Sequence, residues 1–424
     1  MAGTSKDNDV PQMQIRLVTK QQQYSVPDYP LSLSSTTTIK ELNILVNQLL
    51  KDSATEETSE IEFDFIVCSE LLRAPLIEHI NERGVSTEDV VEVEYLEKHP
   101  PPEPQDCLIH DDWVSAVAVC GKWILTGCYD SSLHIWTTKG KRTLTIPGHT
   151  AAIKSVAWIS LDAETGSFVS ASQDQTAIIW QWNIATNSVE CIHICRGHEQ
   201  SLETVGVSLN SFEMATGSWD TMLKIWSTSA EDDNEDGPSA SKKSKIERGK
   251  TRVPKRTLKG HREAISGVVW SDNSEVITSS WDHTLKIWDS ELGGMKHEIT
   301  GNKSFFDLDY SQLSRGLITA SADRHVRLYD PRSTEGSVVK TTFTSHSQWV
   351  QCVRWSTTDD HLFISGGYDN IVKLWDTRSP KAPLYDLSGH EDKVLACNWK
   401  NPKYMVSGGA DNTVRIFKSS RHVS

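Results

Sequence analysis

The chain has 424 residues, of which 37% are hydrophobic and 24% are charged, and its formal net charge is −14. This length and composition predict two or three globular domains. No apolar run approaches 18 residues and residues 1–14 contain no apolar signal core, so the sequence excludes a membrane span and predicts no secretory signal. Eight cysteines without a CxxC pair predict reduced buried thiols and no metal bound by this chain alone.

The charge is concentrated at the front. Residues 1–98 contain 8 basic against 18 acidic residues, which gives them −10 of the total. All fifteen tryptophans lie at or after Trp113, so the two parts of the chain also differ in composition. The anionic front argues against direct nucleic-acid binding there and favours a cationic or metal-bearing partner.

The first predicted elements form a small α+β domain over residues 13–98, after a flexible N-terminus at 1–12. Alternating apolar residues predict strands at 13–18, 61–67 and 90–95, with a weaker strand within 24–33. Residues 39–50 carry one apolar helical stripe, with Thr38 as the cap and Glu41 at the capping-box position, and a short helical turn is expected at 75–83. This order of elements is typical of the ubiquitin-like fold.

A proline-rich stretch at 99–106 is expected to be an extended linker to a repeat region at 107–424. Seven segments share a turn aspartate followed by alternating apolar positions that end in an aromatic residue; the aspartates are Asp130, Asp174, Asp220, Asp282, Asp323, Asp369 and Asp411. Each unit fits four short strands that cannot bury both faces alone, so the units should stack radially into a closed all-β ring. Residues 107–109 are expected to supply the outer strand of the last unit.

Histidine, hydroxyl, aspartate and tryptophan recur in these units. We interpret them as a buried hydrogen-bond network, because one active site repeated around a ring is implausible chemistry. The clearest sets are His149, Ser172, Asp174 and Trp180, and His261, Ser280, Asp282 and Trp288. The fifth unit, with Asn302 and Tyr329, and the seventh, with Phe417, depart from the pattern and should be less well braced.

Residues 229–256 form a charged insert between the third and fourth units. It begins acidic, turns basic and has almost no apolar residues, so it is predicted to be disordered. Lys242, Lys243 and Lys245 are a candidate nuclear import signal, and the insert also fits an RNA-touching arm or a solvated loop. The sequence leaves these interpretations open.

Large aromatic residues gather at the turns of the ring. The positions are Trp113, Tyr129, Trp219, Trp281, Trp349 and Tyr368. Exposed turn aromatics are frequent binding hot spots, so they predict a rim that docks a partner. Packing against the neighbouring unit is the alternative.

The repeats GSWDTMLKIW (217–226) and SSWDHTLKIW (279–288) resemble the WD-repeat family. The resemblance implies an all-β seven-bladed WD-repeat β-propeller, here preceded by the small α+β ubiquitin-like domain. FDFIVCSELLRAPL (63–76) and VSTEDVVEVEYLEK (85–98) before a proline linker are similar to a Notchless-like N-terminal domain. Together they resemble the WD-repeat ribosome biogenesis factors of the PeBoW complex.

This resemblance implies a non-catalytic assembly factor for the large (60S) ribosomal subunit and pre-rRNA maturation, located in the nucleolus and nucleoplasm. It implies that the propeller binds Block-of-proliferation and Pescadillo proteins and the pre-60S particle. The front domain would present Glu88, with Asp89 as runner-up, to the metal of the MIDAS domain of midasin, an AAA-type ATPase that releases the factor. The chain has no GxxxxGK[ST] loop and no cofactor is expected. The alternative is a general adaptor such as a ubiquitin-ligase substrate receptor.

Overall fold

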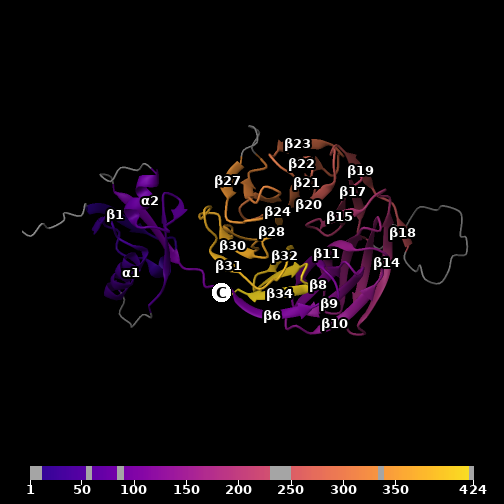
Figure 1. Cartoon of the computed structure of the whole chain (residues 1–424), viewed down its shortest axis with the longest axis horizontal. Coiled ribbons are helices and arrows are strands. Elements are labelled where there is room, and N and C mark those ends of the chain that lie inside the picture. The colour runs from indigo at the N-terminus through magenta and orange to yellow at the C-terminus, as the bar shows by residue number, and fades with distance from the viewer. Residues whose placement is uncertain (1–11, 54–59, 84–89, 230–249, 333–338, 420–424) are drawn as a thin grey trace, which may run out of the picture. The chain divides into compact units, whose positions relative to one another are not determined.

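The computed structural model describes residues 12–53, 60–83, 90–229, 250–332 and 339–419. The chain divides into two compact units, residues 1–100 and 101–424 (Figure 1). Among the described residues, no helix is long and apolar enough to cross a membrane.

The front unit is one five-stranded sheet with a helix packed on it. Its elements are β1 (Gln12–Val18), β2 (Leu31–Ser34), α1 (Ile39–Ser53), β3 (Phe63–Val67), β4 (Glu70–Leu71), α2 (Leu76–Arg83) and β5 (Val91–Glu97), with a 3-10 turn at Gln22–Tyr24. The sheet order is β2-β1-β5-β3-β4, and β1 runs parallel to β5. This is the order of the ubiquitin-like fold, so the predicted fold class is confirmed for this unit.

The expected elements of the front unit form with small shifts. Leu42 and Val46 of α1 are fully buried against the sheet, whereas Ile44 is 58% exposed on the opposite face. At the start of α1, Glu41 Oε2 accepts hydrogen bonds from the backbone N–H and the hydroxyl of Thr38. The weaker strand expected within 24–33 is shorter and later, at β2, because prolines interrupt the preceding segment.

Seven sheets form the second unit, each built on four antiparallel strands, and in the first six blades these four strands follow chain order from the inner to the outer edge. The first four blades are β7 (Val114–Cys120), β8 (Trp123–Cys128), β9 (Ser132–Thr137), β10 (Arg142–Pro147); β11 (Ile153–Leu161), β12 (Thr165–Ser172), β13 (Thr176–Asn183), β14 (Ser188–Arg196); β15 (Leu202–Val207), β16 (Glu213–Ser218), β17 (Met222–Ser227), β19 (Arg256–Lys259); and β20 (Ile265–Asp272), β21 (Glu275–Ser280), β22 (Thr284–Asp289), β23 (Met295–Thr300). Blades 5 and 6 are β24 (Phe305–Tyr310), β25 (Leu317–Ser321), β26 (Val326–Tyr329), β27 (Val339–Phe343); and β28 (Val350–Trp355), β29 (Leu362–Gly367), β30 (Val372–Asp376), β31 (Tyr385–Leu387).

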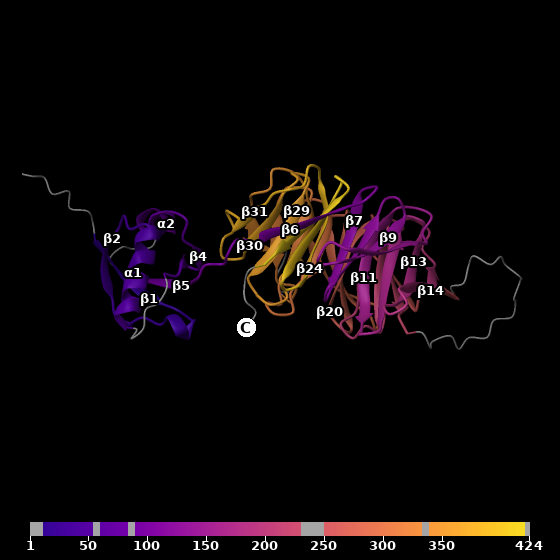
Figure 2. The ribbon, with the colours of Figure 1, turned by 90° about the horizontal axis from the view of Figure 1, so that it is seen from below.

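The last blade joins the two ends of the repeat region. It consists of β32 (Val394–Asn401), β33 (Tyr404–Gly409), β34 (Thr413–Lys418) and β6 (Glu103–Ile109), which is the outer strand. Leu108 pairs with Val414, and Figure 2 shows β6 beside the yellow strands of this blade. The sheets therefore close into the predicted seven-bladed propeller.

Two boundaries expected from the sequence are wrong. The proline-rich linker does not extend to residue 106, because β6 begins at Glu103 and pairs with β34. The charged insert does not extend to residue 256, because residues 250–252 form a strand, β18 (Lys250–Arg252), parallel to β14 of blade 2, and β19 begins at Arg256. Arg252 is buried and donates hydrogen bonds to the Ser227 and Ser229 carbonyl oxygens, which explains why residues 250–252 form a strand here.

Candidate partner-binding rim of the propeller

A buried network fixes the turns at one end of each regular blade. In blade 2, His149 Nδ1 lies 2.8 Å from Asp174 Oδ2, and His149 Nε2 lies 2.7 Å from Ser170 Oγ. Trp180 Nε1 donates to the same Ser170 oxygen at 2.9 Å. Because a carboxylate only accepts, His149 donates from Nδ1 and accepts the Ser170 hydroxyl proton at Nε2.

The hydroxyl that links histidine to tryptophan is not the one expected. In blade 2 it is Ser170 rather than Ser172, and in blade 4 it is Thr278 rather than Ser280. The two candidate positions of each blade share one face of the strand. The tryptophan donates its hydrogen bond to the position farther from the turn, which is Ser170 in blade 2 and Thr278 in blade 4. Ser172 and Ser280 lie at the strand ends, where their oxygens accept the N–H groups of Asp174 and Asp282.

The same arrangement recurs around the ring. Histidine contacts aspartate in four further blades, at His198–Asp220, His261–Asp282, His346–Asp369 and His390–Asp411. Burial raises the pKa of Asp174, but the hydrogen bond from His149 and those from the neighbouring loop outweigh it and lower the pKa to about 2. In blade 5, Arg327 takes the place of the histidine and forms an ion pair with Asp323.

A backbone hydrogen bond positions the residue before each turn aspartate. Its N–H donates to a carbonyl oxygen of the loop that enters the inner strand: Tyr129 to Trp113 at 3.0 Å, and Tyr368 to Trp349 at 2.8 Å. The entering loop and the turn between the second and third strands of an antiparallel blade lie at the same end. The six aromatic residues predicted as a rim therefore all lie at one end of the propeller.

The rim aromatics contact one another in pairs and remain accessible. Ring centroids are 5.3 Å apart for Trp113 and Tyr129, 5.2 Å for Trp219 and Trp281, and 5.6 Å for Trp349 and Tyr368. Trp113, Trp219 and Trp349 are 43%, 41% and 47% exposed, respectively. Their partners are half-buried, so one member of each pair supports a ring that is available for binding.

Charged side chains join the aromatics where the central channel opens. Lys154 Nζ lies 3.0 Å from Glu203 Oε1 and donates to the Tyr129 hydroxyl at 3.1 Å, and Trp219 Nε1 donates to Glu203 Oε2 at 3.1 Å. Burial lowers the pKa of Lys154, but Glu203 and Tyr129 raise it more, so Lys154 is charged. Lys393 Nζ lies 4.8 Å from the Tyr368 ring centroid.

The mouth of the channel is formed by one repeat position. The inner strand of each blade starts with a buried apolar residue, and the residue that follows it lines a cavity of about 130 Å³. These seven residues are Ser115, Lys154, Glu203, Ser266, Phe306, Gln351 and Leu395. Sequence reasoning missed Lys154, Glu203, Phe306 and Lys393. Alignment of the inner strands by repeat register would have found the first three, because they occupy equivalent positions.

The other predicted site residues lie outside the described residues. Glu88 and Asp89 fall in residues 84–89, between α2 and β5. Lys242, Lys243 and Lys245 fall in residues 230–249, between β17 and β18. Their roles stay predictions.

Comparison with known proteins matches both units to families. Residues 13–80 match the NLE (NUC135) domain. Seven segments match the WD domain, G-beta repeat: 103–137, 140–181, 189–227, 252–289, 293–330, 337–376 and 381–418. The chain is 59% identical over 408 residues to the protein of Aedes aegypti named "Ribosome biogenesis protein WDR12 homolog", covering 96% of each chain. It is 57% identical over 415 residues to the protein of the same name from Drosophila erecta, covering 98% of this chain and 97% of the relative.

Proposed function

This chain belongs to the family of WD-repeat ribosome biogenesis proteins with an N-terminal NLE domain, and from this premise we propose that it is a non-catalytic assembly factor for the large (60S) ribosomal subunit. It acts in pre-rRNA maturation in the nucleolus and nucleoplasm. The observation that carries the proposal is identity of 59% over 96% of both chains, which includes both units rather than the repeats alone.

The propeller binds its partners through the aromatic rim. In this proposal, Block-of-proliferation and Pescadillo proteins dock there and hold the chain on the pre-60S particle. Paired aromatic residues beside a half-buried Lys154–Glu203 ion pair support this role, because interface hot spots combine large rings with charged groups.

The rim is tested by co-purification of these partners with the full chain. Trp219→Ala with Trp281→Ala should abolish capture of Block-of-proliferation. The matched control is Phe212→Ala, because Phe212 is 67% exposed in the turn after the inner strand of blade 3, at the opposite end. Capture that is unchanged in the double variant would show that the rim is the wrong surface. Cullin-type partners in place of pre-ribosomes would favour the adaptor alternative.

The NLE domain links the chain to midasin. Glu88 provides a carboxylate oxygen to the MIDAS Mg²⁺, and ATP-driven pulling on this link releases the factor from the particle; Asp89 is the alternative ligand. The acidic charge of residues 1–98 would speed the encounter with a cationic face.

The link is tested by binding of the full chain to the midasin MIDAS domain with Mg²⁺, with EDTA, and with Glu88→Ala or Asp89→Ala. Loss of binding with EDTA and with Glu88→Ala, but not with Asp89→Ala, supports the proposal. Binding that survives both EDTA and Glu88→Ala removes it.

Nuclear import is tested separately with Lys242→Ala, Lys243→Ala and Lys245→Ala combined, and unchanged nuclear entry would exclude this signal.

A further inference from the structure

Blade 1 departs from the network of the other blades. Its turn aspartate, Asp130, accepts the N–H and the hydroxyl of Ser132 at 2.9 and 2.6 Å. His110 Nδ1 lies instead 3.4 Å from the Leu108 carbonyl oxygen. The histidine of blade 1 is therefore held by backbone rather than by the carboxylate that anchors its counterparts.

Two residues of blade 1 also differ from their repeat equivalents. Cys128 stands two residues before the turn aspartate, where blades 2, 3 and 4 have Ser172, Ser218 and Ser280. His134 stands four residues after it, where blades 3, 4 and 6 have Lys224, Lys286 and Lys373. Both changes introduce side chains that bind thiophilic metals.

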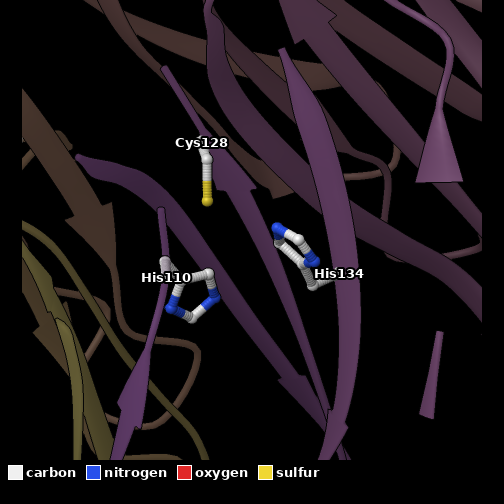
Figure 3. Close-up of side chains that lie close together, drawn as sticks. All are labelled: His110, Cys128 and His134. Atoms are coloured by element: carbon white, nitrogen blue, oxygen red, sulfur yellow. The ribbon is translucent and has the colours of Figure 1, made fainter. Parts of the chain in front are cut away.

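The three side chains converge. His110 precedes β7, Cys128 ends β8, and His134 lies on β9 directly opposite Thr126 (Figure 3). All three are buried, at 5%, 0% and 2% exposed, and one donor atom of each lies within 4.8 Å of the others. Ligands of one tetrahedral zinc ion lie roughly 3.5 Å apart, so small side-chain rotations would close the triangle.

The Nε2 atoms of both rings can serve a metal once they give up their present hydrogen bonds. The Leu108 carbonyl can only accept, so His110 carries its proton on Nδ1 and has its lone pair on Nε2. His134 Nε2 lies 2.9 Å from Ser132 Oγ, whose own proton goes to Asp130, so this nitrogen donates in the metal-free chain. Thr145 Oγ1, 3.0 Å from His134 Nδ1, can accept as well as donate, so the ring proton can move to Nδ1 and leave the Nε2 lone pair for a metal. Metal-bound histidines commonly donate their second N–H to such partners.

Binding would displace three hydrogen bonds: the one between His134 Nε2 and Ser132 Oγ, and two at His110 Nε2. Trp136 Nε1 donates to His110 Nε2 at 3.1 Å, and the Thr126 hydroxyl lies 2.9 Å from the same atom. In blades 2 and 4 the equivalent tryptophan donates to the equivalent hydroxyl, at 2.9 and 2.8 Å. Trp136 would thus find Thr126 as its acceptor once the metal occupies His110.

Nearby carboxylates also suit a cation. Asp130, Asp112 and Asp111 lie close enough to Cys128 to act on it electrostatically, and they would offset the charge of a bound ion. Binding would release the thiol proton to solvent.

We propose that blade 1 binds one thiophilic d¹⁰ cation, Zn²⁺ or Cu⁺, through His110 Nε2, His134 Nε2 and Cys128 Sγ. The two-nitrogen, one-sulfur donor set suits both ions and disfavours Mg²⁺ and Ca²⁺, which prefer oxygen ligands. Cu⁺ accepts three ligands, whereas Zn²⁺ would take water as its fourth.

The test uses the full chain, stripped with a chelator and titrated with Zn²⁺ alone or, under anaerobic reducing conditions, with Cu⁺ alone. Metal content after gel filtration and competition with a chromophoric chelator give stoichiometry and affinity. Cys128→Ser and His134→Lys restore residues that other blades carry, so both variants should fold. Cys120→Ser, a half-buried cysteine at the end of β7, is the matched control.

Wild type and Cys120→Ser should retain one ion per chain, and the two site variants should bind at least about 10-fold more weakly. Substitution with Co²⁺ should give a thiolate charge-transfer band in wild type, a readout that needs no variant. Failure of wild type to retain either ion, wild-type affinity in Cys128→Ser, or a Co²⁺ complex without the thiolate band would overturn the proposal. The ion retained more tightly identifies the metal.

Discussion

Asn43 of α1 forms two hydrogen bonds with the backbone of Phe63 in β3. Its Nδ2 donates to the Phe63 carbonyl oxygen at 3.0 Å, and its Oδ1 accepts the Phe63 N–H at 2.7 Å. One turn later, Asn47 repeats the pattern with Ile61, at 2.8 and 3.0 Å. Two helical amides thus pair with the backbone of the segment that leads into β3, as a neighbouring strand would.

Replacing Asn43 should loosen this side of the NLE domain. Asn43→Ala leaves the Phe63 N–H and carbonyl groups without these partners at a partly buried site, which should cost about 1–3 kcal/mol of local stability. Hydrogen exchange of the β3 amides measures the effect. Ile44→Ala, on the exposed face of the same helix, should leave exchange nearly unchanged; equal effects of both variants would refute the strand-like role.

The outer strand of the last blade should depend on Leu108. This residue is 2% exposed and packs with Val114, Val414 and Ile416, so Leu108→Ala should cost about 2–5 kcal/mol. The adjacent Ile109 is 74% exposed, and Ile109→Ala should change stability little. Denaturant unfolding followed by tryptophan fluorescence compares the two, since all tryptophans lie in the propeller unit.

Arg252 should hold the end of the charged insert. Its guanidinium donates to the Ser227 oxygen at 2.7 Å and to the Ser229 oxygen at 2.6 Å, and Nη2 lies 2.9 Å from His193 Nε2. Arg252→Ala should increase hydrogen exchange and proteolysis around 250–252, whereas Val253→Ala, at a 72% exposed position, should not. Identical proteolysis of both variants would show that Arg252 does not hold this strand.

The His149–Asp174 pair should make propeller stability depend on pH. The folded-state pKa of Asp174 is lowered to about 2 from the unfolded value of 3.8, so its stabilisation is full above pH 4 and is lost as the pH falls through 2. The loss amounts to about 2 kcal/mol. Urea unfolding between pH 5 and 2 measures it, and the slope should be shallower in Asp174→Asn. A slope unchanged by this substitution would assign the acid sensitivity to other groups.

The sequence predicts the ring because its signal is local and repeated. A turn aspartate, period-2 alternation and a terminal aromatic recur seven times, and each feature is set by one hairpin. The helix at 39–50 and its exposed Ile44 follow from periodicity in the same way. These features need no knowledge of distant contacts.

The features that the sequence could not predict depend on which strands pair or on which neighbour a side chain is long enough to contact. Ser170 and Ser172 share one strand face, and alternation cannot decide which of them meets Trp180. The order at Glu103–Ile109 comes from a partner strand at the other end of the repeat region, and proline content alone suggested a linker. The cluster of His110, Cys128 and His134 has no recognised ligand spacing, because its members meet only across neighbouring strands.

The pairing of β6 with β34 has a consequence for synthesis of the chain. The first strand of the propeller leaves the ribosome long before residues 413–418, its partner, have been translated. Until then blade 7 lacks its outer strand, and the ring retains unpaired strand edges that can misassociate with other nascent chains. Closure is therefore a late, high-contact-order step, and a chaperone that shields the open ring would act between emergence of β6 and of β34.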